Sequence, residues 1–299
     1  MTIVLIAVLL YLAASALLVR ALGRDESTGS PTWLWPALPA MLLHGGYHVM
    51  VAMRTNGGPD MHFFAALSLV GLGMAWLTSL VGARGRMSAL GVVVFPLAAV
   101  LLLAYHGYGH EPSKVLGWRL ASHAWLALLA YATLSIAALL AIMLWLQERA
   151  LRRREFRPWL RALPPLADLE SLLFRVLTVG FALLTLTLVT GVLFVDDLLA
   201  QKLVHKTVLS VLSWIVFGVL LIGRRRYGWR GMKAVHWTLA AMLLLLLAFF
   251  GSQFVIAGPL LAPTVQAGPG CPERTAVARA LSEATARDGG ARPRGPRAM

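Results

Sequence analysis

The sequence contains little charge and almost no cysteine. Of its 299 residues, 13% are charged and 59% are hydrophobic, whereas an ordinary soluble domain has about 25% charged residues. So small a charged fraction does not cover the surface of a soluble protein of this length, and the excess apolar side chains must therefore face lipid. The single cysteine, Cys271, excludes an internal disulfide framework, and no CxxC redox or haem-attachment motif is present.

Acidic residues are scarce as well, with 13 Asp and Glu against 27 Lys and Arg and a formal net charge of +14. A basic balance can indicate nucleic acid, but in a membrane protein it usually reflects cytoplasmic loops rich in Lys and Arg. We therefore expect a lipid bilayer and no nucleic acid as partner. The sequence also lacks a nucleophile–base constellation, HExxH, a P-loop and a GxGxxG fingerprint, so we expect a binding protein and no enzyme.

Long apolar runs are abundant. A helix needs about 20 mostly apolar residues to cross a hydrocarbon core of about 30 Å. The runs predict an all-α fold, a polytopic transmembrane helical bundle of about eight spans at roughly 2–22, 33–53, 62–82, 88–106, 121–146, 172–195, 204–222 and 236–257. Because the first run lacks a basic n-region and a small-residue cleavage site, we expect it to be a span and not a signal peptide.

These runs define one transmembrane domain, residues 1–257, in which four N-terminal spans (2–106) precede a second region (121–257). Residues 258–299 are rich in Gly, Pro, Ala and Arg, and we expect them to form a disordered tail on the outer side.

Basic residues alternate between the predicted connections. The first, third, fifth and seventh connections hold 15 Lys and Arg, and the second, fourth and sixth hold 4. The positive-inside rule places the basic connections in the cytoplasm, so we predict a multi-pass protein of the bacterial inner (plasma) membrane with both termini on the outer, periplasmic side.

The eight histidines are distributed unevenly across this topology. Those at the outer ends of spans are His62, His106, His110, His123 and His205, while His44 and His48 lie within the second span and His236 alone is cytoplasmic. His123 opens the fifth span and His205 opens the seventh, at the same predicted depth. Two imidazoles from different helices can take both axial positions of one haem iron. His123 and His205 are therefore candidate ligands of a non-covalent b-type haem, with hydrated interfacial histidines as the alternative.

His44 and His48 are spaced i, i+4 and share a helix face. Ionisable residues within a span indicate a functional site by default, so the two could contact a cofactor, bind a smaller metal or hydrogen-bond to a neighbouring helix. We interpret His62, with Asp60 nearby, and His106 and His110 in the run HGYGHEP, as ordinary loop residues.

Three segments of the second region carry a family resemblance. They are a helix led by His123 and ending in basic residues (122–154), a helix with the pattern GFxLLTxxxxxG (174–194), and a helix that begins at His205 and ends in GWRG (205–231). Together they resemble the cytochrome c assembly family, the haem-handling CcsA/CcmC-like membrane proteins. The segment before His205 has no tryptophan-rich WWD-type motif, which is similar to the shorter YpjD/HemX-type branch of that family.

The resemblance implies haem binding or haem handling in cytochrome c assembly (biogenesis), with haem and cytochrome c maturation or haem-synthesis proteins as partners. It places His123 at an outer haem-ligand position. The pairing with His205 is inferred from depth alone, and His44 is a plausible haem contact within the membrane.

Two other functions are consistent with the same residues. A metal or small-solute transporter could use His44, His48 and the outer histidines, although no predicted buried acidic residue supports it. A membrane scaffold or regulator of haem-pathway proteins would need no ligand, and its histidines would satisfy local hydrogen bonds.

Overall fold

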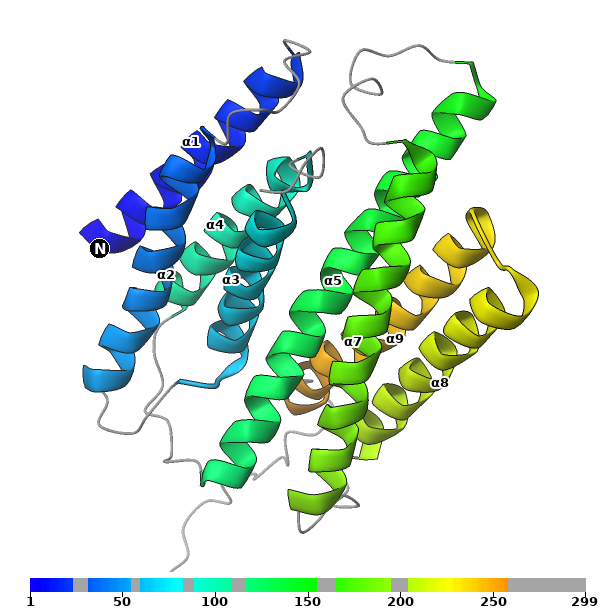
Figure 1. Cartoon of the computed structure of the whole chain (residues 1–299). Helices are drawn as coiled ribbons and strands as arrows, with labels where there is room; N and C mark the ends of the chain where they lie inside the picture. Colours follow the sequence, from blue (N-terminus) through cyan, green and yellow to red (C-terminus); the bar gives the residue numbers. More distant parts are fainter. Residues whose placement is uncertain are drawn as a thin grey trace, which may run out of the picture. The chain divides into compact units, whose positions relative to one another are not determined.

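The structure, a computed structural model, describes residues 1–23, 32–54, 60–82, 89–108, 117–154, 165–194 and 204–257; the side chains of 204–205 and 251–257 lie outside that description. These ranges are helical and contain no strand (Figure 1). The helices are α1 (Thr2–Gly23), α2 (Leu34–Arg54), α3 (Phe63–Gly82), α4 (Gly91–Gly107), α5 (Trp118–Arg152), α7 (Leu166–Phe194), α8 (Val204–Tyr227) and α9 (Met232–Ala257).

Each of the eight predicted apolar runs is a helix, so the all-α prediction is confirmed. Six helices of the described ranges are long and apolar enough to cross a membrane. α4 is apolar but has only 17 residues, and α2 carries a polar centre from His44 to His48. Both of these helices have a proline in their interior, Pro39 in α2 and Pro96 in α4, which helices packed in a membrane tolerate.

α5 and α7 are longer than the predicted spans, because each continues beyond its apolar stretch. α5 has 35 residues and ends at Arg152, whose side chain pairs with Glu148 one turn earlier at 2.8 Å. Such an i, i+4 pair supports the last turn of a helix. α7 begins at Leu166 with Asp168 in its first turn. A carboxylate at this position interacts favourably with the helix dipole and stabilises the helix. The connection between the fifth and sixth predicted spans, residues 147–171, is therefore shorter in the structure than predicted, at both ends.

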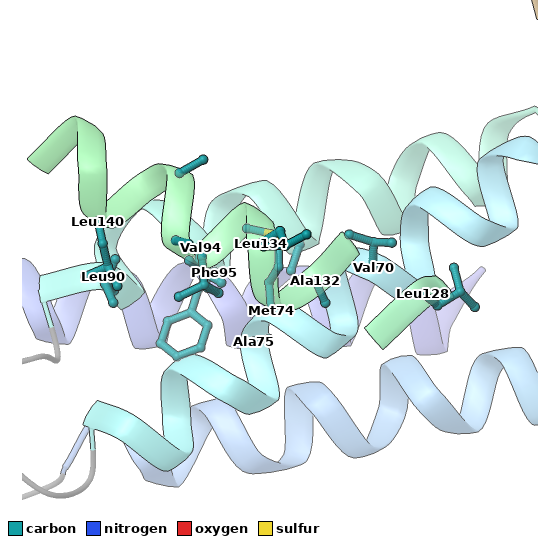
Figure 2. Packing of buried hydrophobic residues seen from close by; sticks show 14 of the residues in the cluster. Val70, Met74, Ala75, Leu90, Val94, Phe95, Leu128, Ala132, Leu134 and Leu140 are labelled. Atoms are coloured by element: carbon teal, nitrogen blue, oxygen red, sulfur yellow. The ribbon is translucent and has the colours of Figure 1, made fainter. Parts of the chain in front are cut away.

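Most helices pack against the next helix along the chain, and α1 and α3 also pack against α4 and α5, respectively. α1 contacts α2 and α4, α3 contacts α2, α4 and α5, and α7 contacts α5 and α8. The long α5 and α7 run side by side (Figure 1). Figure 2 shows apolar side chains of α3, α4 and α5 meeting in one cluster, among them Met74, Val94 and Leu134. Alanines at this cluster, such as Ala75 and Ala132, let the helices approach closely, as packing within lipid requires.

Residues 256–299 form a separate unit. The structure describes only its first residues, at the end of α9. The predicted tail at 258–299 and Cys271 lie outside the described residues.

Candidate functional site

His123 lies in the second turn of α5 and faces α7. Its Nδ1 is 3.1 Å from the hydroxyl oxygen of Thr190. That hydroxyl donates its own hydrogen to a backbone carbonyl, with Leu186 O at 2.8 Å and Thr187 O at 3.0 Å. A hydroxyl has one hydrogen; while Thr190 gives it to a carbonyl, its oxygen accepts from His123, and the imidazole then carries its proton on Nδ1.

The other ring nitrogen of His123 is therefore left with a free lone pair. Besides Thr190, the His123 ring has a hydrogen bond with the backbone of Thr187 and no other partner in the described part of the chain, and the side chain is half-buried. Gly191 allows the ring to lie close against α7, because a Cβ at that position would be 3.2 Å from His123 Cε1. An axial histidine binds iron through one nitrogen while the other donates to a neighbouring acceptor. The donor geometry of His123 thus fits a haem ligand.

His205 is the second residue of α8, and its side chain lies outside the described residues. The spacing between the His123 and His205 rings is therefore untested, and the pair stays a prediction.

A second group of histidines lies in a hydrogen-bonded network among α1 to α4. The His44 side chain is fully buried between two hydroxyls, with Nδ1 3.1 Å from Tyr11 Oη and Nε2 2.9 Å from Ser68 Oγ. The same Ser68 oxygen is 3.1 Å from Nε2 of His48. Because both nitrogens of His44 already have partners, a haem contact at His44 requires rearrangement of this network and stays a prediction.

The network continues to an acidic side chain at the start of α3. Asp60 is 3% exposed; its Oδ1 accepts from His62 Nδ1 at 2.6 Å, and its Oδ2 accepts from the Tyr105 hydroxyl at 3.3 Å. The His48 ring stacks on Tyr105 with centroids 4.5 Å apart and an interplanar angle of 4°. These contacts connect the centre of α2 to the ends of α3 and α4.

Sequence reasoning missed part of this network. His62 lies just before α3, as expected of a loop residue, but its ring binds Asp60; His106 lies inside α4, and its Nδ1 is 2.7 Å from Tyr47 Oη. The expectation that no acidic residue is buried is wrong for Asp60. The available signal was the tyrosines in the apolar runs, because a buried tyrosine hydroxyl usually has a hydrogen-bond partner. Within the described ranges, no group of three or more His, Cys, Asp or Glu is arranged to hold a metal ion.

Comparison with known proteins identifies the family. The family model described as Cytochrome C assembly protein matches residues 34–260. The chain is 30% identical over 254 residues to the inner membrane protein YpjD of Escherichia coli (strain K12), covering 84% of this chain and 96% of that relative. It is 32% identical over 134 residues to the protein HemX of Brevibacillus brevis, covering 44% of this chain and 49% of HemX.

A more distant relative is the cytochrome c biogenesis protein CcsA of Prochlorococcus marinus, 25% identical over 93 residues, which cover 30% of this chain and 29% of CcsA. No solved structure matches the chain. Its apolar helices and its similarity to an inner membrane protein show a multi-pass protein of the inner membrane. The match over residues 34–260 and the 96% coverage of YpjD show that the chain belongs to the cytochrome c assembly protein family.

Proposed function

We propose that this protein binds or handles haem in the inner membrane during cytochrome c assembly, with His123 as one axial ligand. The observation that carries the proposal is the contact with Thr190, whose hydroxyl favours the tautomer of His123 with its lone pair on Nε2. The family match supports the process, and one relative, CcsA, is named a cytochrome c biogenesis protein.

Each residue at the site has a separate role in this proposal. His123 would hold the iron through Nε2, Thr190 orients the ring, and Gly191 allows the ring to approach α7. His205, at the start of α8, supplies the second imidazole. When bound, haem supplies an iron centre whose behaviour is set by its axial ligands and their hydrogen bonds.

The absence of a WWD-type motif before His205 bears on how haem would be held. A tryptophan-rich surface would give haem an exposed apolar shelf, and the sequence VDDLLAQKLVHKT offers none. Haem bound between helices, handed to cytochrome c maturation or haem-synthesis proteins, agrees better with this sequence than haem displayed at the surface.

The test is the absorption spectrum of the purified full chain, expressed with ample haem supply. Wild type should show a low-spin bis-histidine haem spectrum. His123→Ala and His205→Ala should each remove the low-spin signature, and the double variant should lose haem. His236→Ala is the matched control, because His236 is exposed at the other end of the helices and should leave the spectrum unchanged. A wild-type protein that stays haem-free, or a His123→Ala protein with an unchanged spectrum, would contradict the proposal.

A further inference from the structure

A basic cavity lies where α5 ends and α9 begins, far along α5 from His123. Its volume is about 510 Å³. It is lined by Trp145, Glu148, Arg149 and Arg152 of α5, by Arg153 directly after α5, and by Met232 and His236 of α9. Trp145, Arg149 and Arg152 are spaced three or four residues apart and therefore share one face of α5. Met232 and His236 share a face of α9 for the same reason.

The lining carries a net positive charge. Its one acidic side chain, Glu148, is engaged at Oε1 by Arg152 at 2.8 Å. The other carboxylate oxygen of Glu148 is buried, with Gly231 packed against it. The residues around the cavity include three arginines and one glutamate, a formal charge of +2 with His236 neutral; the wall itself is almost entirely apolar, so this charge lies at the rim, where an anionic group fits better than a cationic one.

The cavity has an apolar floor and a basic rim. Trp145 lies one turn closer to the centre of α5 than Arg149, whose guanidinium is over the indole at 5.2 Å from the ring centroid. Arg152 and Arg153 follow at the end of α5 and are exposed. An indole at this level, followed by arginines, is typical of the boundary between hydrocarbon and headgroups. A free inorganic anion would use only the rim, whereas a lipid would use the rim and the floor.

We propose that this cavity binds an anionic phospholipid, with the phosphate group at Arg149, Arg152 and Arg153 and the start of an acyl chain against Trp145 and Met232. Basic pockets between transmembrane helices are known to hold anionic lipid headgroups. The site is separate from His123, so its test succeeds or fails independently of haem binding.

The experiment measures lipid retained by the purified full chain in mild detergent, by native mass spectrometry. The protein is titrated in parallel with phosphatidylglycerol and with phosphatidylcholine of the same acyl chains. Wild type should retain more phosphatidylglycerol than phosphatidylcholine. Arg149→Gln with Arg153→Gln should weaken that binding about 30-fold, at about fivefold for each arginine near the membrane surface.

The matched control is Arg20→Gln with Arg226→Gln, which removes two exposed arginines that do not line the cavity. It should retain phosphatidylglycerol like wild type. His236→Glu provides a second measurement at an exposed position: it should weaken phosphatidylglycerol binding, while His236→Gln should not. Equal retention of the two lipids by wild type, equal loss in both double variants, or displacement of the lipid by millimolar inorganic phosphate would each overturn the proposal.

Discussion

At the scale of the residue, Ser68 holds two histidines of α2 with one hydroxyl. Its Oγ lies 2.9 Å from His44 Nε2 and 3.1 Å from His48 Nε2. A hydroxyl donates one hydrogen, so at least one of these imidazoles must donate to Ser68. The Ser68 hydroxyl of α3 therefore restricts which ring nitrogens of the two α2 histidines carry a hydrogen.

Ser68→Ala should consequently destabilise the protein by about 1–3 kcal/mol, since it leaves Nε2 of the buried His44 without its partner. The free energy of unfolding in a detergent titration measures this. Ser79→Ala is the control on the same helix, because Ser79 is also buried but donates to the carbonyl of Ala75 one turn earlier. An equal loss of stability in both variants would show that Ser68 acts only through its volume.

Thr190→Val tests the orientation of His123. Valine keeps the shape of the side chain and removes the acceptor for His123 Nδ1, and loss of such an outer hydrogen bond usually weakens a metal site about 10- to 100-fold. Haem retention of the purified protein should fall at least about 10-fold, and the haem spectrum should change. Thr178→Val is the control in α7, since its hydroxyl contacts only Phe174 O within the same helix. A Thr190→Val protein that binds haem like wild type would refute the role given to this hydroxyl.

The histidines themselves could be identified from the sequence, because an imidazole in an apolar run is conspicuous. Their partners could not. Tyr11 and Ser68 are 33 and 24 residues from His44, and only the packing of three helices brings them together. Thr190 likewise lies 67 residues from His123 and was one of several ordinary polar residues in its run. Burial of Asp60 also depends on tertiary structure, because the residue precedes α3 in an irregular stretch.

At the scale of the element, the α5–α7 pair depends on a small residue at its crossing. A Cβ at Gly180 would lie 2.6 Å from Leu134 Cδ2 and 2.8 Å from Leu134 Cγ. Leu134 is fully buried, so its side chain has little room to move. The helices were predictable from apolar runs, but this closeness depends on a partner that the sequence does not reveal. The extra turns of α5 and α7 instead have local signals, the Glu148–Arg152 pair and Asp168.

Gly180→Ala should therefore destabilise the protein by about 1–3 kcal/mol, as overpacking of a core does. Gly180→Ala combined with Leu134→Ala should cost less than the sum of the two single losses, because the truncation removes the atoms in conflict. Gly218→Ala is the control, since a Cβ there would meet Phe181 at an ordinary 3.6 Å. Thermal unfolding in detergent distinguishes these outcomes. If Gly180→Ala were as stable as Gly218→Ala, close packing at Gly180 would not contribute to stability.

At the scale of the whole molecule, the orientation in the membrane rests on the basic connections, which hold 15 Lys and Arg against 4 in the others. This distribution predicts an outer C-terminus, and the single cysteine, Cys271, allows a direct test. A membrane-impermeant maleimide should label Cys271 in intact spheroplasts. Cys271→Ser combined with Ser27→Cys moves the only thiol to the first, basic connection, which should react only after the membrane is permeabilised. If the two proteins reacted in the opposite order, the charge rule would have assigned the sides wrongly, and the lipid cavity would face the outer leaflet.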